Sequence, residues 1–340
     1  MDEYSTKGLD PAPPVSMTTI PMAGILVDVY GQDELASADM PLTCLWLLHP
    51  RTRTRARMRD IACRTVDAWH RSASSPASSQ GARGLVALAF DMPNHGTRLV
   101  SELANRTWDE GNERHALDMA GIVKGCVGDL SALMDLVAGY LGRRVDAHVC
   151  LGWSLGGHAA WWSWFVEDRI DAAVAVVGCP DYLNLMGRRA RGSGLDAGDA
   201  SLLGSRYFPR DLLAACRTRD PKSILFGADG EPVPSPPLPE GERPRLREVL
   251  DARVKGKKLL ACSGGEDVLV PYASSSPFLG VLKDAAEGWY RDGEVVVEDR
   301  VYAGVGHRFS ADMVRDAVGF LVRVVADGPR RRASGSRLAE

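Results

Sequence analysis

The chain has 340 residues, of which 45% are hydrophobic and 25% are charged, so it has the composition of a globular protein and can bury a substantial core. Its formal net charge of −3 gives no reason to expect nucleic acid or an anionic membrane as a partner. No apolar run approaches the roughly 20 residues of a membrane span, and the polar, acidic N-terminus does not resemble a secretory signal.

The seven cysteines are an odd number and contain no Cys-x-x-Cys pair. Cys44, Cys150, Cys179 and Cys262 lie in apolar runs, where cysteine usually behaves as a small buried hydrophobe. We therefore expect a reducing, cytoplasmic compartment, with neither a disulfide framework nor a metal site.

The chain order of the predicted elements indicates an α/β protein. Residues 1–19 contain three prolines and little periodicity, which predicts a flexible N-terminal arm. Beyond the arm, apolar runs typical of strands alternate with segments of helical spacing. The expected strands are 24–30, 42–49, 85–90, 147–151, 172–177, 258–262 and 294–301, and the expected helices are 57–71, 118–141, a helix directly after 154, 276–288 and 311–326.

Strands separated by helices predict parallel crossover units and a mostly parallel central sheet with helices on both faces. Between 182 and 256 the alternation lapses, and glycine, arginine and proline clusters interrupt short helical patches, which predicts an inserted cap or a set of long loops. We expect one α/β domain over 20–326, followed by a disordered tail at 327–340.

The segment Gly152-Trp153-Ser154-Leu155-Gly156 has the Gly-x-Ser-x-Gly pattern between an apolar run and a predicted helix. Strand, sharp turn and helix is the context of a nucleophile elbow, in which the glycines avoid collisions around a serine of strained backbone. The turn also leaves backbone N–H groups at a helix N-terminus, where negative charge is stabilised. The pattern alone is weak, because a glycine-rich turn without chemistry has the same letters.

An acid and a histidine follow the elbow in the order expected of a Ser-acid-His triad. Asp267 lies in a loop after the penultimate strand, and His307 lies in Gly-His-Arg after the last strand. A neutral serine needs an imidazole to take its proton, and the imidazole needs a carboxylate to fix its tautomer. We therefore predict Ser154, Asp267 and His307 as catalytic residues. Other acids that could take the carboxylate role are Glu266, Asp181 and Asp229.

Three other histidines, His49, His95 and His158, are weaker candidates. His158 lies on the helix of the elbow, where support by packing is the favoured interpretation, and His49 ends a central strand. For the oxyanion hole we predict the Leu155 N–H and, from the loop after strand 42–49, the Arg51 N–H, with Thr52 as the alternative. Pro50 has no N–H to donate.

Arginines stand at every second position from 51 to 59. They could attract an acidic or phosphate-bearing acyl substrate, but a solvated charged face is the favoured interpretation. Trp153 and Leu155 beside the serine indicate an apolar surround, suited to an acyl chain. The residues expected to line the substrate pocket are His49, Pro50, Trp153, Asn94, His95, Asp181 and Tyr182.

Four motifs in order carry a resemblance to a known group: Asp91-x-Pro-Asn-His-Gly-Thr-Arg98, Gly152-x-Ser-x-Gly156, Gly264-Gly-Glu-Asp-Val-x-Val-Pro271 and Gly306-His-Arg308. Over roughly residues 24–326 the chain resembles the α/β-hydrolases of the prolyl-oligopeptidase-like, dienelactone-hydrolase-like branch, and most closely their small single-domain bacterial acyl esterases. The insertion matches poorly.

The resemblance implies the α/β-hydrolase fold and gives Ser154, His307 and Asp267 the roles of nucleophile, general base and orienting acid. It implies hydrolysis of carboxylic esters without a cofactor, and a loop Asp91–Arg98 that shapes the site without performing chemistry. The family's His-Gly oxyanion turn is replaced here by His49-Pro50.

We therefore predict a serine esterase that acts on a small-molecule ester of small or medium acyl chain through an acyl-enzyme. A thioesterase would use the same residues, and a peptidase of this branch usually carries a large extra domain that 340 residues cannot hold. A non-catalytic binding member of the fold is the alternative from another class. An oxidoreductase is disfavoured because no Gly-x-Gly-x-x-Gly follows an early strand. A homodimer is the one protein partner left open.

Overall fold

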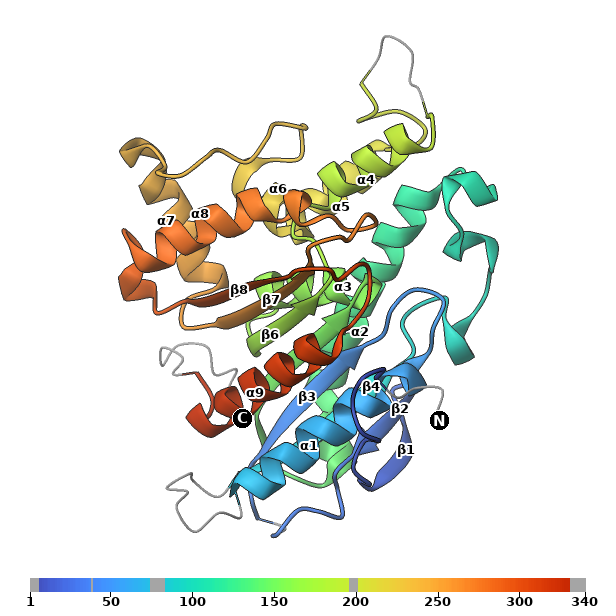
Figure 1. The fold of residues 1–340 in the computed structure, drawn as a ribbon, viewed down its shortest axis with the longest axis vertical. Coiled ribbons are helices and arrows are strands. Elements are labelled where there is room, and N and C mark those ends of the chain that lie inside the picture. The colour runs from blue at the N-terminus through green and yellow to red at the C-terminus, as the bar shows by residue number, and fades with distance from the viewer. Residues whose placement is uncertain (1–5, 38, 74–82, 196–200, 331–340) are drawn as a thin grey trace.

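The computed structural model describes residues 6–37, 39–73, 83–195 and 201–330. Its centre is one eight-stranded sheet in the order β1-β2-β4-β3-β5-β6-β7-β8 (Figure 1). The strands from β3 onward are mutually parallel, whereas β1 and β2 run antiparallel to their neighbours. The strands are β1 Met17–Met22, β2 Ile25–Tyr30, β3 Leu42–Leu48, β4 Gly84–Phe90, β5 Val145–Trp153, β6 Ile170–Val176, β7 Lys258–Gly264 and β8 Val296–Tyr302.

Helices cover both faces of the sheet, and the side-chain alternation of the strands decides which face each residue reaches. On β3, Trp46 packs into the core shared with α2, α3 and α8, while Leu45 and Leu47 pack into the core shared with α1 and α9. The predicted α/β fold with a mostly parallel sheet is thus confirmed. These helices are α1 Arg59–Ala73, α2 His115–Leu141, α3 Leu155–Val166, α8 Ser276–Glu287 and α9 Ala311–Asp327.

The N-terminal segment differs from the predicted flexible arm. Strand β1 begins at Met17 and forms a hairpin with β2 through a turn at Ala23 and Gly24, both at positive φ. Ahead of it, Leu9 packs against the core, and Thr6 Oγ1 donates to Asp60 on α1 at 2.6 Å. The sequence does not predict β1, because most side chains of this edge strand are exposed and the strand contains a proline, which an edge strand tolerates. Residues 1–5 of the predicted arm lie outside the described residues.

In the described part of 182–256 there are four α-helices, and this part packs on the main core. Leu212, Leu225 and Leu246 belong to the same hydrophobic cluster as α2 and α3, so the described part of this span is not a separate core. Residues 196–200 lie outside the described residues. The four helices are α4 Tyr182–Gly192, α5 Arg210–Arg219, α6 Pro221–Phe226 and α7 Arg243–Arg253.

The start of the predicted disordered tail is packed in the structure. Helix α9 continues to Asp327, and Arg330 pairs with Asp168 at 2.6 Å and donates to the Lys255 carbonyl at 2.7 Å. The prediction is therefore wrong for 327–330, because a side chain three residues beyond the helix finds acceptors on neighbouring loops. Residues 331–340 lie outside the described part of the chain.

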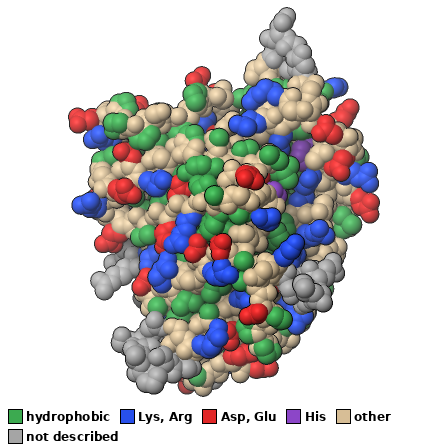
Figure 2. All heavy atoms as spheres, viewed as in Figure 1, with side chains coloured by type: hydrophobic (Ala, Val, Ile, Leu, Met, Phe, Trp, Pro, Cys, Tyr) green, Lys and Arg blue, Asp and Glu red, His purple; other side chains and the backbone are tan. Residues whose placement is uncertain are grey.

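Charged groups of both signs are interspersed on the face of the molecule drawn in Figure 2, in keeping with the small net charge. Within the described residues, no helix combines the length and the apolar composition that crossing a bilayer requires.

Candidate active site

The turn between β5 and α3 holds Ser154 in a conformation that non-glycine residues rarely adopt, with φ 57° and ψ −112°. Close packing imposes the two glycines around it. A Cβ on Gly152 would collide with the Gly156 carbonyl, and a Cβ on Gly156 would collide with the Leu48 carbonyl at the end of β3. The elbow predicted from the sequence is therefore formed by backbone contact between β3, β5 and α3.

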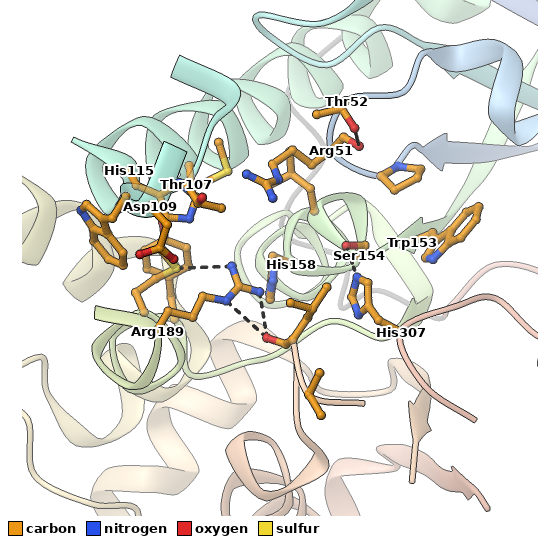
Figure 3. A pocket seen from close by; sticks show the side chains of 18 of the residues that line it. Arg51, Thr52, Thr107, Asp109, His115, Trp153, Ser154, His158, Arg189 and His307 are labelled. Atoms are coloured by element: carbon orange, nitrogen blue, oxygen red, sulfur yellow. Dashed lines mark hydrogen bonds between the residues drawn. The ribbon is translucent and has the colours of Figure 1, made fainter. Parts of the chain in front are cut away.

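Ser154, His307 and Asp267 form one chain of hydrogen bonds. Ser154 Oγ lies 2.7 Å from His307 Nε2, and His307 Nδ1 lies 2.8 Å from Asp267 Oδ2 (Figure 3 for Ser154 and His307). The other carboxylate oxygen, Oδ1, accepts the N–H groups of Leu269 and Val270, each at 2.9 Å. Because the carboxylate is an acceptor, Nδ1 carries the proton and Nε2 is free to accept the serine proton.

The other three acids weighed from the sequence lie elsewhere. Glu266 and Asp229 are exposed. Asp181 is buried and caps α4 by accepting the Asn184 N–H at 3.2 Å, and burial raises the pKa of its carboxyl. Of these acids and Asp267, only Asp267 is hydrogen-bonded to His307 in the described structure.

A cavity of ≈ 650 Å³ opens at the carboxyl ends of the strands and contains Ser154 and His307 on its wall. Of the seven predicted pocket residues, the structure places Pro50, Trp153 and Tyr182 there. Both predicted oxyanion donors, Arg51 and Leu155, also line it.

Leu155 is the first residue of α3, so its N–H has no acceptor in a preceding helical turn. Arg51 lies in a tight turn closed by the Arg53 N–H donating to the Pro50 carbonyl at 3.2 Å. The end of β3 that leads into this turn is in contact with Gly156, so the turn is held against the elbow.

Four predicted pocket residues do not line this cavity. His49 is fully buried: its Nε2 accepts the Met92 N–H at 2.9 Å, so its Nδ1 donates to the Pro50 carbonyl at 2.9 Å. Burial lowers the pKa of His49 to about 4. His95 is buried against it, with the ring centroids 5.1 Å apart. Asn94 binds the backbone of 100 and 101 instead, and Asp181 lines a different cavity. Strand-end position alone therefore does not bring a residue into the cavity.

The loop Asp91–Arg98 is fixed to the segment after β3 by hydrogen bonds of Asp91. Asp91 is buried and accepts the backbone N–H of Arg55 at 2.8 Å, the Arg55 guanidinium at 2.6 Å and the Thr97 N–H at 2.9 Å. Hydrogen bonds from Arg55 and Thr97 hold the pKa of Asp91 low against its burial. A Cβ on Gly96 would collide with this carboxylate, which explains the glycine. None of the described residues of this loop lines the cavity.

His158, favoured as a packing residue, is buried on α3 and lines the cavity. Its Nδ1 accepts the Cys179 N–H at 3.0 Å and so ties α3 to the loop after β6. Burial lowers its pKa to about 3, so the ring is neutral near pH 7. Its contacts are those of a supporting residue.

Part of the cavity wall is formed by residues that the sequence did not predict. Met186 and Arg189 come from α4, and His115 and Met119 from α2. Tyr182, Met186 and Arg189 stand at i, i+4 and i+7, the spacing that puts residues on one side of a helix. This helical spacing is visible in the sequence, but it lies in the span 182–256, for which we predicted only a cap or a set of long loops.

The expectation of a solvated face for the arginines at 51–59 is also wrong for part of the run. Arg51 and Arg57 line the cavity, and Arg57 lies over the Trp153 ring at 4.8 Å. Arg55 pairs with Asp28 at 3.0 Å and with Asp91. The loop therefore folds several of these side chains inward.

All seven cysteines are buried free thiols. Among the described residues, no group of three or more His, Cys, Asp or Glu side chains is placed to hold a metal ion.

No protein-family model and no curated protein sequence matches the chain. Solved structures do match it. The protein TT1662 from Thermus thermophilus is 17% identical, over 92% of this chain and 98% of that one, with a TM-score of 0.55. A putative dienelactone hydrolase from Klebsiella pneumoniae is 14% identical, over 91% of this chain and 97% of that one, with a TM-score of 0.50.

Dipeptidyl peptidase 4 from Porphyromonas gingivalis is 14% identical, over 91% of this chain but only 35% of that one, also with a TM-score of 0.50. Together with the sheet order and the helices on both faces, these likenesses establish that the protein has the α/β-hydrolase fold. This is the fold that the four motifs predict.

Proposed function

We propose that the protein is a serine hydrolase that cleaves the carboxylic ester of a small or medium acyl group through an acyl-enzyme. The observation that carries the proposal is the hydrogen-bonded chain from Ser154 Oγ through His307 to Asp267, at the wall of a cavity of ≈ 650 Å³. An unpaired serine on a turn would support no such conclusion.

In the proposed reaction, His307 Nε2 takes the proton of Ser154 as Oγ attacks the ester carbonyl carbon. When the tetrahedral intermediate collapses, the same nitrogen gives the proton to the leaving alcohol oxygen. A water molecule, deprotonated in turn by His307, then releases the acid from the serine. Asp267 holds the imidazole in the required tautomer and stabilises its positive charge during both steps.

The negative oxygen of the intermediate needs preorganised donors. We assign these to the N–H groups of Leu155 and Arg51, since one follows the nucleophile at a helix start and the other lies in the turn held against the elbow. Pro50, which stands where the family has a glycine, contributes no N–H.

A thioester would be cleaved by the same groups in the same order. We also propose that 20–326 is a single catalytic domain and that the enzyme works in the cytoplasm, because a reducing compartment maintains free thiols such as the seven found here.

The test is turnover of 4-nitrophenyl esters of increasing chain length, measured beside acyl-CoA thioesters, with the wild-type protein and Ser154→Ala. We expect ester hydrolysis that the substitution abolishes while the folded state persists by circular dichroism. Turnover that survives in Ser154→Ala, or no turnover of any ester by folded protein, would contradict the proposal; the second result favours a binding member of the fold.

A further inference from the structure

One end of the cavity is built differently from the end that holds Ser154. Arg51 from the loop after β3, His115 from the start of α2 and Arg189 from α4 converge there, and we call this region the arginine lobe (Figure 3). In Figure 3 these three side chains lie on the side of Ser154 away from Trp153. Three separate elements thus bring two guanidinium groups and one imidazole to a shared space.

Arg189 has little to neutralise it. Its Nη2 and Nε donate to the Leu269 carbonyl at 2.9 and 3.3 Å, and within the described residues no carboxylate lies at ion-pair distance. A guanidinium has five N–H donors, so several remain for another acceptor. Burial lowers the pKa of Arg189, and the nearby charge of Arg51 lowers it further.

Arg51 is held in a similar way. Its Nη1 donates to the Asn105 carbonyl at 2.8 Å, and it too makes no ion pair among the described residues. Burial lowers its pKa, and the charge of Glu110 acts in the opposite direction. Two half-buried, mutually repelling cations whose oxygen partners in the described structure are neutral carbonyls are unfavourable, because a charge withdrawn from water is normally paired.

The acids near the lobe do not neutralise the positive charge of Arg51 and Arg189. Asp109 lines the cavity but is exposed, and it accepts the Ser193 hydroxyl at 2.9 Å. Glu110 is exposed and binds the backbone N–H of Thr107 at 2.8 Å. Asp267 acts on Arg189 at longer range but is bound to His307.

His115 supplies an independent sign of a polar ligand. It is 1% exposed, and its Nδ1 is a buried polar atom without a hydrogen-bond partner in the described structure. Leaving such an atom unsatisfied is costly, so buried polar groups usually have a partner. The ring cannot supply a compensating charge, because burial, with Arg51 and Arg189, lowers its pKa to about 4.

From the convergence of Arg51, Arg189 and the unpartnered Nδ1 of His115 in one cavity, we infer that the ester cleaved by this protein carries an anionic group, a carboxylate or a phosphate, at the far end of its acyl chain. This inference rests on the proposed function. Guanidinium groups match both anions by paired N–H···O bonds. The acyl side is assigned because the leaving alcohol must lie beside His307, which protonates it. In Figure 3 the lobe lies on the side of Ser154 away from Trp153 and His307.

The first experiment measures binding and needs no turnover. Calorimetry follows glutarate and inorganic phosphate with the wild-type protein, Arg189→Gln and Arg188→Gln. Arg188 is the matched control because it is exposed on the same helix and loses the same charge. We expect an anion to bind the wild type and Arg188→Gln, and to bind Arg189→Gln about 10- to 100-fold more weakly, the loss expected for one charge-assisted hydrogen bond. Tighter binding of glutarate would indicate a dicarboxylate acyl group, and tighter binding of phosphate would indicate a phosphorylated one.

The second experiment compares kcat/KM for 4-nitrophenyl hydrogen glutarate with that for 4-nitrophenyl pentanoate, its neutral analogue. The ratio should favour the anionic ester in the wild type and in Arg188→Gln and fall about 10- to 100-fold in Arg189→Gln. Arg51→Gln is the second lobe variant, should Arg189→Gln fail to fold, and we expect the same direction.

The outcomes separate the two proposals. Ester turnover with no preference for the anionic ester, and no anion binding by the wild type, would overturn the inference and leave the serine hydrolase intact. Equal anion binding by wild type, Arg189→Gln and Arg51→Gln would overturn it as well. Anion binding lost in the lobe variants, with no ester turned over, would instead support the lobe and contradict the proposed function.

Discussion

The two ends of the cavity differ in how their polar groups are satisfied. Around Ser154, the serine oxygen, both nitrogens of His307 and both oxygens of Asp267 have partners within the chain. In the arginine lobe, two guanidinium groups make no ion pair, and one imidazole nitrogen has no partner, among the described residues. The first end is organised before a substrate arrives, and the second is organised so that a ligand completes it.

The largest expected effect on activity concerns the end of the cavity that holds Ser154. Ser154→Ala removes the nucleophile, so kcat should fall by about 10⁶ with folding intact. Steady-state kinetics on a 4-nitrophenyl ester, with circular dichroism as the folding control, measures it. Turnover within tenfold of the wild type would mean that the hydrogen-bonded serine is not the nucleophile.

Asp267→Asn should lower kcat by about 10⁴, because an amide no longer holds His307 in the required tautomer. The matched control is Glu266→Gln, the exposed neighbour, which should keep nearly normal turnover. Normal turnover in Asp267→Asn, with a loss in Glu266→Gln, would move the role to the neighbour.

Gly156→Ala tests the packing that holds the elbow. Its methyl group would collide with the Leu48 carbonyl, so we expect a loss of roughly 3 kcal/mol or more in the free energy of unfolding. Gly128→Ala on α2 is the control, since nothing lies within 4 Å of a Cβ there, and it should stabilise by about 0.5–1 kcal/mol. Urea denaturation of both variants decides; a Gly156→Ala protein as stable as the wild type would refute the packing argument.

The smallest effect belongs to the arginine lobe and appears as a pH dependence. The folded pKa of His115 is about 4, below its ordinary value of 6.5, so the unfolded chain binds more protons between those two pH values. Stability is therefore present above pH 6.5 and lost as the pH falls to 4, by up to about 3 kcal/mol for this residue.

In His115→Gln the loss between pH 6.5 and 4 should be smaller than in the wild type, although His49 and His158, whose pKa values are also lowered, keep part of it. Urea denaturation at both pH values measures it. An unchanged pH dependence would show that His115 is not kept neutral in the folded protein by its burial and the neighbouring arginines.

The sequence predicted the fold and the residues of the hydrogen-bonded chain because both depend on short-range patterns. Buried strands, a Gly-x-Ser-x-Gly turn and the order of Ser154, Asp267 and His307 are all visible as letters. The element boundaries differ by a few residues, as for α2, which begins at His115 and not at 118.

What the sequence did not predict depends on where loops turn in space. His49 directly follows β3 and His95 lies in the loop after β4, yet the two rings pack against each other in the core. The Met92 N–H and the Pro50 carbonyl hold the His49 ring there. Arg51 was predicted as a backbone N–H donor, and a solvated face was the favoured interpretation for its side chain, which the structure instead places at the cavity. Arg189 was missed since the helix that carries it lies in the span without regular alternation.

The most direct test of the central claim is labelling with a fluorophosphonate probe, followed by mass spectrometry of the labelled peptide. We expect one adduct, on Ser154, which is absent in Ser154→Ala and forms more slowly in Asp267→Asn. Folded wild-type protein that stays unlabelled, or an adduct that persists in Ser154→Ala, would contradict this expectation.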